Sequence, residues 1–101
     1  VRRMAAYATA KAAVAHLTRC LAVEASDHNV RVNCVAPGIT ETDFHAVTPP
    51  EFLKHSVDNR ILLHRIGKPE EVAQAVVFLV KNDYITGEVV TVDGGLTMRI
   101  A

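Results

Sequence analysis

The sequence lacks an excess of charge of either sign. Lysines and arginines total 11 and acidic residues also total 11 in a chain of 101 residues, and the basic residues are scattered along the chain. Such a chain has no net field to attract nucleic acid or an anionic membrane. We therefore predict neither a nucleic-acid partner nor a membrane partner.

Long apolar runs and cysteine pairs are also scarce. No apolar run approaches the roughly 18 residues that cross a bilayer, and the first residues do not form the basic and apolar regions of a secretory signal. The two cysteines, Cys20 and Cys34, do not form a CxxC pair. We interpret them as small buried hydrophobic residues in a reducing compartment, which favours a cytoplasmic protein.

The histidines do not have the spacing of a metal site. No HxH or HxxxH pair and no His/Cys cluster occurs among them, so we assign no metal. His28 fits the end of a helix, where the dipole favours a basic residue. The five are His16, His28, His45, His55 and His64.

Apolar residues make up 50% of the chain and follow helical and strand patterns in turn. We predict a helix over 7–26, a buried strand over 30–36, a short helix opened by proline over 49–59, a helix that begins at Pro69, and a strand over 88–95. A strand–helix–strand crossover makes the two strands parallel. Parallel apolar strands need neighbours and helices on both faces. We therefore predict an α/β fold: one partial domain over the whole chain, forming the end of a larger doubly wound parallel sheet.

The helix that begins at Pro69 carries Glu70 and Glu71 in its first turn, where acidic residues suit the helix dipole. Residues 60–67 are predicted to form a polar connector before it. The segment 93–95, Asp-Gly-Gly, is predicted to be a turn rather than a phosphate loop. The predicted core stripe of the helix is Val72, Ala75, Val76, Leu79 and Val80.

Residues 7–11 read YATAK, which places Tyr7 and Lys11 on one helix face, one turn apart. A free tyrosine titrates near pH ~10, and a nearby ammonium favours its ionised form. A tyrosine of this kind can give a proton to a carbonyl oxygen or take one from a hydroxyl. The pair is a candidate for proton transfer, although the same spacing also occurs where the lysine is simply solvated.

A second candidate site follows the first predicted strand. Pro37 and Gly38 lie at its carboxyl end, where open α/β sheets bind ligands. Proline fixes the backbone and glycine lets it approach a ligand closely. Thr40 and Thr42 follow with hydroxyls and backbone amides that suit an amide or a phosphate, or that bond to their own backbone in a turn.

Taken in order, these segments resemble the short-chain dehydrogenase/reductase family. The shared motifs cover nearly the whole chain, and the likeness is to the C-terminal portion of these enzymes, which have a Rossmann-like fold. TETDF and VDGGLTM are most similar to the subgroup of 3-oxoacyl-[acyl-carrier-protein] reductases, glucose dehydrogenases and hydroxysteroid dehydrogenases. The motifs are YATAK, VRVNCVAPG, ITETDF, RIGKPEEVAQAVVFLV and YITGEVVTVDGG.

The resemblance implies an NAD(P)-dependent oxidoreductase that transfers a hydride between nicotinamide and a carbonyl or secondary alcohol, with a 3-oxoacyl thioester as the favoured substrate. Tyr7 would donate or accept the proton and would also touch the cofactor. Lys11 would hold the nicotinamide ribose hydroxyls and assist the tyrosine. Pro37 and Gly38 would form part of the cofactor wall.

The resemblance also assigns roles to the residues that follow. Thr40 would contact the nicotinamide carboxamide through its main chain, and Thr42 would lie near the carboxamide and the pyrophosphate. Residues from about 43 to 66 would form the variable loop that closes over the substrate. The implied cofactor is NADP or NAD, with NADP preferred, and the implied assembly is a homotetramer or homodimer.

Several motifs of the family do not occur in these 101 residues. They are the glycine-rich TGxxxGxG turn, the NNAG stretch, a helix asparagine and the catalytic serine, all expected before Tyr7. Without the glycine-rich turn nothing cradles the pyrophosphate, so we expect the 101-residue chain by itself to be inactive. Two alternatives stay open: a truncated, non-catalytic oligomerisation or interaction module, and one part of a longer enzyme.

Overall fold

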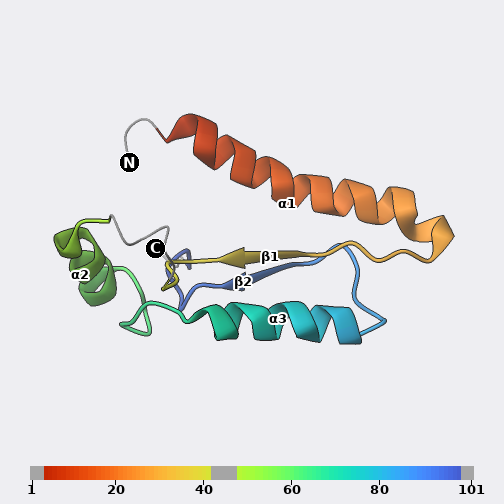
Figure 1. Ribbon diagram of the computed structural model, residues 1–101. Helices are drawn as coiled ribbons and strands as arrows, with labels where there is room; N and C mark the ends of the chain where they lie inside the picture. Colours follow the sequence, from red (N-terminus) through yellow and green to blue (C-terminus); the bar gives the residue numbers. More distant parts are fainter. Residues whose placement is uncertain (1–3, 42–47, 99–101) are drawn as a thin grey trace. The chain divides into compact units, whose positions relative to one another are not determined.

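The computed structural model describes residues 4–41 and 48–98. The chain forms two compact units, one of residues 1–34 and 79–90 and the other of residues 35–78 and 91–101. The elements, labelled in Figure 1, follow the order α1 (Ala5–Ala25), the 3-10 turn η1 (Ser26–His28), β1 (Cys34–Pro37), α2 (Pro50–Asn59), α3 (Pro69–Lys81) and β2 (Val89–Val92). The predicted order of elements is confirmed, and the prediction of one partial domain stays a prediction.

β1 and β2 form a two-stranded sheet, and their arrows point the same way in Figure 1. The amide of Cys34 donates to the carbonyl of Glu88 at 2.9 Å, and the amide of Gly38 donates to the carbonyl of Val92 at 3.0 Å. The bonds advance in the same direction along both strands, as parallel pairing requires. The predicted α/β class with parallel strands is confirmed.

The first strand begins later than predicted, at Cys34 rather than at residue 30, and it extends to Pro37. The residues before Cys34 use their polar groups in another way. The amide of Val32 donates to the hydroxyl of Thr86 at 3.1 Å, and the side chain of Asn33 accepts from the amide of Glu88 at 3.1 Å. Side-chain bonds therefore replace ladder bonds here, which a pattern of β-branched residues does not reveal.

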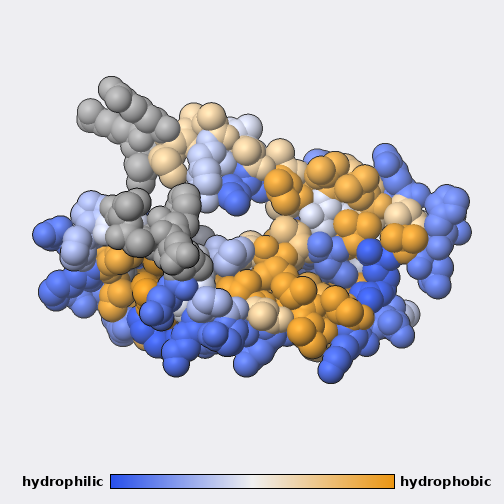
Figure 2. Space-filling model, in the orientation of Figure 1, coloured by the Kyte–Doolittle hydropathy of each residue, from blue (hydrophilic) through white to orange (hydrophobic). Residues whose placement is uncertain are grey.

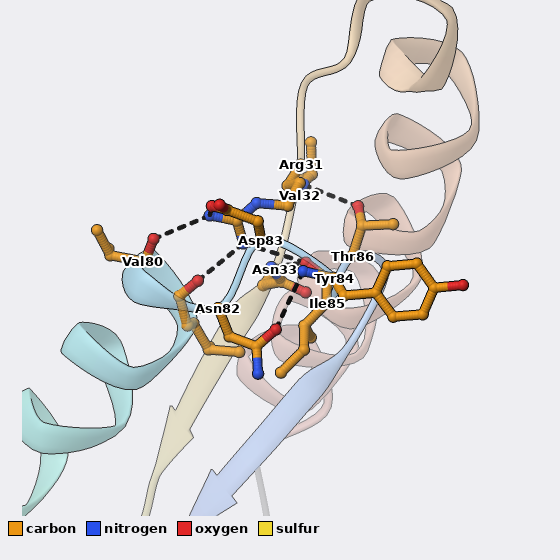
Figure 3. A network of polar contacts seen from close by, with 10 residues as sticks. Arg31, Val32, Asn33, Val80, Asn82, Asp83, Tyr84, Ile85 and Thr86 are labelled. Atoms are coloured by element: carbon orange, nitrogen blue, oxygen red, sulfur yellow. Dashed lines mark hydrogen bonds and ion pairs between the residues drawn. The ribbon is translucent and has the colours of Figure 1, made fainter.

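The guanidinium of Arg31 closes the C-terminal end of α3, as Figure 3 shows. Its Nη1 donates to the carbonyls of Leu79 at 2.8 Å and Ile85 at 3.1 Å, and its Nη2 donates to the carbonyl of Val80 at 3.0 Å. Asp83 lies 3.9 Å from the same guanidinium. The last carbonyls of a helix have no partner within it, so the planar fork of arginine supplies the donors that the helix end lacks.

α1 starts two residues before its predicted position and ends at Ala25. The turn η1 and the left-handed Asn29, with φ of 55°, stop it, as the segment 27–29 predicted. Cys20 is exposed and Cys34 is partly exposed, and neither of them forms a disulfide bond. The prediction that the cysteines are buried is therefore wrong.

α3 begins at Pro69, as predicted, and the side chain of Glu71 organises its first turn. The carboxylate accepts the amide of Lys68 at 3.0 Å, half of a capping box. It also accepts both guanidinium nitrogens of Arg65, each at 2.8 Å. Hydrogen bonds from Arg65 and from the Lys68 amide lower the pKa of Glu71 to about 2.

Few apolar side chains are buried in the described residues, and the buried hydrophobic set is Ala22, Ile61 and Leu79. Of the residues predicted to form a core stripe on α3, Leu79 is buried, at 6% exposed, whereas Val76 and Val80 are exposed. Residues 60–67 were predicted to be polar, whereas Ile61 is only 2% exposed. Figure 2 shows hydrophobic surface over α3. None of the described helices has the length and hydropathy needed to cross a bilayer.

Candidate active site

Tyr7 and Lys11 lie together on α1 in the first unit. The helix forms because residues 5–25 are rich in alanine, the residue with the highest helix propensity. The Nζ atom of Lys11 lies over the ring of Tyr7, 5.4 Å from its centroid, within the range of a cation–π contact. The side chain of Tyr7 is 56% exposed, so a substrate can reach its phenol. The predicted proximity is confirmed, and the catalytic role of the pair stays a prediction.

Pro37 and Gly38 lie at the carboxyl end of β1 in the second unit. The amide of Gly38 continues the ladder by donating to Val92. A Cβ atom on Gly38 would lie 2.5 Å from the Cβ of Asp93 and 2.8 Å from its Cα. The close approach that this glycine permits in the structure is therefore to Asp93, whereas the sequence suggested a close approach to a ligand.

Thr40 forms an isolated parallel bridge with Gly67. The amide of Gly67 donates to the carbonyl of Ile39, and the amide of Glu41 donates to the carbonyl of Gly67, both at 2.9 Å. Along an extended chain, the backbone N–H and C=O groups of successive residues point to opposite sides. The N–H and C=O of Thr40 itself therefore point away from Gly67. They form one donor and one acceptor side by side, which is the complement of a carboxamide.

The hydroxyl of Thr40 has a different role from its main chain. It donates to the carbonyl of Gly38 at 3.3 Å, and the residue is only 7% exposed. The hydroxyl therefore bonds within the turn, so any ligand contact at Thr40 would have to use the main chain. Thr42, and residues 43–47 of the predicted variable loop, lie outside the described residues.

A cavity of about 400 Å³ opens in the second unit beside this segment. Its apolar lining comes from Ile39, Leu62, Leu63, Val72 and Val92. The lining carboxylates are already bonded, that of Glu71 to Arg65 and that of Asp93 to Thr97. The cavity therefore offers shape and apolar surface rather than a free acid or base.

The sequence did not identify Asp93, Thr97 and Gly67 as residues of the site. Each lies in or beside a turn that holds the segment 38–41. The Asp-Gly-Gly segment was predicted to be a turn that, by the family resemblance, helps to form subunit contacts and the floor of the substrate pocket. Aspartate followed by glycine is a signal for a side-chain-closed turn, but the packing of that turn against Gly38 depends on the sheet register. No group of three or more His, Cys, Asp or Glu side chains in residues 4–41 and 48–98 could hold a metal.

Comparisons with known proteins identify the family to which the chain is similar. A family model described as "Enoyl-(Acyl carrier protein) reductase" matches residues 1–97. The chain is 45% identical over 94 residues to the 3-oxoacyl-[acyl-carrier-protein] reductase FabG of Thermotoga maritima, covering 91% of this chain and 38% of that protein. It is 44% identical over 92 residues to carbonyl reductase family member 4 of Danio rerio, covering 91% of this chain and 37% of that protein.

Two solved structures also match. A candidate gluconate dehydrogenase from Agrobacterium tumefaciens superposes with a TM-score of 0.84 at 34% identity, covering 95% of this chain and 39% of that one. A small-chain dehydrogenase in complex with NADPH superposes with a TM-score of 0.83 at 28% identity, covering 95% of this chain and 44% of that one. The chain thus spans less than half the length of each of these four proteins.

Proposed function

Because the chain belongs to the short-chain dehydrogenase/reductase family, we propose that it supplies the proton-transfer pair and part of the cofactor wall of an NAD(P)-dependent oxidoreductase. The pair on α1 carries the proposal, since the Nζ of Lys11 lies 5.4 Å from the ring centroid of Tyr7 and the phenol is accessible. The substrate is a carbonyl compound or secondary alcohol. A 3-oxoacyl thioester is preferred because the Thermotoga maritima reductase is 45% identical to this chain.

Each residue has a chemical task in this proposal. Tyr7 gives its phenolic proton to the carbonyl oxygen of the substrate during reduction and takes it back during oxidation. Lys11 holds the ribose hydroxyls of the cofactor and places its ammonium over the ring of Tyr7. Bound nicotinamide supplies or accepts the hydride.

The cofactor wall is assigned to the end of β1. Pro37 and Gly38 shape it, and the N–H and C=O of Thr40 bind the carboxamide through one donor and one acceptor. The assignment of Thr42 to a position near the carboxamide and the pyrophosphate remains a prediction. NADP is preferred to NAD, with support from the matching dehydrogenase in complex with NADPH. We retain a cytoplasmic location as a proposal, because Cys20 and Cys34 are not joined by a disulfide bond.

The first experiment replaces Tyr7 by Phe in the whole protein. In parallel it uses a chimera that joins the N-terminal part of the Thermotoga maritima reductase to these 101 residues. NADPH oxidation is followed with a 3-oxoacyl thioester. We expect kcat to fall by about 10² or more, because a positioned general acid contributes roughly that factor. Tyr84→Phe removes a phenol from a fully exposed side chain and is the control expected to keep wild-type kcat.

If the unsubstituted protein oxidises NADPH and Tyr7→Phe retains the same turnover, the proposal is contradicted. The 101-residue chain alone should show no NADPH oxidation, since the glycine-rich turn that cradles the pyrophosphate is not among its residues. Turnover by that chain would show that the cofactor needs no further nucleotide-binding part.

A second candidate function is an interaction module without catalysis. Exposed apolar side chains on α1 and α3, among them Leu17 and Phe78, favour it. The same surfaces support the homodimer or homotetramer expected for the enzyme. Tyr7→Phe separates the two candidates, because an interaction module would keep its partner and would have no turnover to lose.

A further inference from the structure

We propose that Asp93 and Thr97 are positioning residues for the cofactor wall: the turn that they close fixes the main chain of residues 38–40. The inference rests on the proposed function, because it takes the main chain of Thr40 as the carboxamide site. Neither residue needs to touch cofactor or substrate for this role. The two residues would act on the carboxamide site by fixing the position of Gly38.

The carboxylate of Asp93 closes its turn by accepting hydrogen bonds from residues that follow it. Its Oδ1 accepts the amide of Gly95 at 2.8 Å. Its Oδ2 accepts the amide of Thr97 at 2.9 Å and the hydroxyl of Thr97 at 2.6 Å. A carboxylate has the lone pairs to accept all three, and bonds to a charged acceptor are stronger than neutral ones. The turn is therefore held from within.

Gly38 lies directly against this turn. A Cβ on Gly38 would come within 2.8 Å of the Cα of Asp93. The two main chains can approach each other this closely because glycine has no side chain. The amide of Gly38 is bonded to the carbonyl of Val92, the residue before Asp93. Any shift of Asp93 toward β1 must therefore move Gly38.

A second set of hydrogen bonds fixes residues 39–41, which follow Gly38 in the chain. Gly67 bonds to both neighbours of Thr40, accepting from Glu41 and donating to Ile39. The orientation of the N–H and C=O of Thr40 thus depends on two fixed points, Gly38 against Asp93 and the bridge to Gly67. Loosening the first should misplace the carboxamide site without removing any atom of it.

The same turn also holds the chain that leaves α2. The carbonyl of Gly94 accepts the amide of Leu63 at 3.1 Å. Gly94 has φ of 63°, and a Cβ on it would lie 2.9 Å from the Cγ2 of the buried Ile61. The turn therefore connects the end of the predicted substrate-covering region to the cofactor wall.

The test compares Thr97→Val with Thr97→Ser in the whole protein. Valine keeps the shape of threonine and loses only the 2.6 Å bond to Asp93, whereas serine keeps the hydroxyl. The readouts are the Kd for NADPH from nicotinamide fluorescence, the KM for NADPH, and kcat at saturating NADPH. A control, Thr86→Val, removes a threonine hydroxyl bonded to the amide of Val32 in the other unit.

We expect Thr97→Val to raise both the Kd and the KM for NADPH by roughly three- to tenfold, which is less than the full contribution of a hydrogen bond to a charged group because the loss reaches the cofactor only through Gly38. The kcat at saturating NADPH should stay within about twofold of wild type, because binding rather than the chemical step is weakened. Thr97→Ser should restore wild-type binding. Hydrogen exchange without cofactor should speed up at the amide of Gly38 and not at the amide of Cys34, which bonds to Glu88.

Wild-type Kd and Gly38 exchange in Thr97→Val would overturn the inference, and so would an equal rise of Kd in Thr86→Val. These outcomes leave the proposed function intact as long as Tyr7→Phe abolishes turnover. Failure of Tyr7→Phe to reduce turnover would instead remove the proposed function, whatever the Thr97 variants show.

Discussion

The carboxylate of Glu71 makes two separate contacts at the start of α3. It caps the first turn of α3 through the amide of Lys68 and binds the guanidinium of Arg65 through both of its oxygens. Both contacts require the ionised carboxylate. The pKa of Glu71 in the folded protein is about 2, below its ordinary value of 4.5. The folded state therefore binds this proton less readily than the unfolded state.

A pH dependence of stability follows from this depressed pKa. The contribution of Glu71 should be complete above pH 4.5 and should be lost as the pH falls toward about 2. Glu71→Gln should lower the free energy of unfolding at neutral pH, and its difference from wild type should shrink across that window. Urea denaturation at a series of pH values measures the difference.

Glu70→Gln is the matched control, since it removes the same charge one position earlier in the same helix turn. Its effect should be smaller than that of Glu71→Gln. A constant difference between wild type and Glu71→Gln from neutral pH down to pH 3 or below would contradict the prediction.

Single residues also differ in how far they could be predicted. The proximity of Tyr7 and Lys11 follows from helix geometry alone, because residues four apart share a face. The partner of Gly38 could not be found in this way. Asp93 lies far along the chain, and only the register of β1 against β2 brings the two together.

At the scale of elements, the end of α3 depends on a side chain from outside the helix. The guanidinium of Arg31 donates to the carbonyls of Leu79, Val80 and Ile85 with bonds of 2.8 to 3.1 Å. Figure 3 shows the guanidinium beside Val80 at the end of the helix. Lysine carries the same charge but lacks the planar fork. Arg31→Lys should lower the free energy of unfolding by about 1–2 kcal/mol, since at least one carbonyl loses its donor.

Urea denaturation of Arg31→Lys measures this loss. Lys54→Met is the control, because it breaks a pair of exposed side chains, Lys54 and Asp58, and should have no measurable effect. Equal stability of Arg31→Lys and wild type would show that charge, rather than the forked geometry, holds the helix end.

The elements themselves were predicted unevenly for a physical reason. The start of α3 was predicted correctly because proline at the first position and acidic residues beside it are local signals. The start of β1 was predicted four residues early because Val32 and Asn33 bond to Thr86 and Glu88 instead of forming a ladder. Such long-range side-chain bonds leave no periodic signal in the sequence.

At the scale of the whole molecule, the described residues expose large apolar side chains on both α1 and α3. Hydrophobic burial drives folding and association in proportion to the area removed from water. In the described residues, Leu17 on α1 is 52% exposed and Phe78 on α3 is 55% exposed. The hydrophobic surface over α3 is visible in Figure 2. Isolated apolar side chains are ordinary on protein surfaces, but several large ones on the same helix favour an interface.

The 101-residue chain should therefore associate with itself in a concentration-dependent manner. Phe78→Gln and Leu17→Gln should each weaken association by about tenfold, because burying one large apolar side chain contributes roughly 1.5 kcal/mol or more. Sedimentation velocity over a range of concentrations measures the effect. Ala73→Gln changes an exposed small residue of α3 and should leave association unchanged.

A monomer at every concentration would contradict the prediction and would also remove the support for the interaction module. Association that persists in Tyr7→Phe is expected under either candidate function, since the phenol belongs to the chemistry and not to the apolar surface. Association and turnover are therefore independent readouts. A chain that associates but, within the whole protein, loses turnover when Tyr7 is replaced would carry both an interface and the proton-transfer pair.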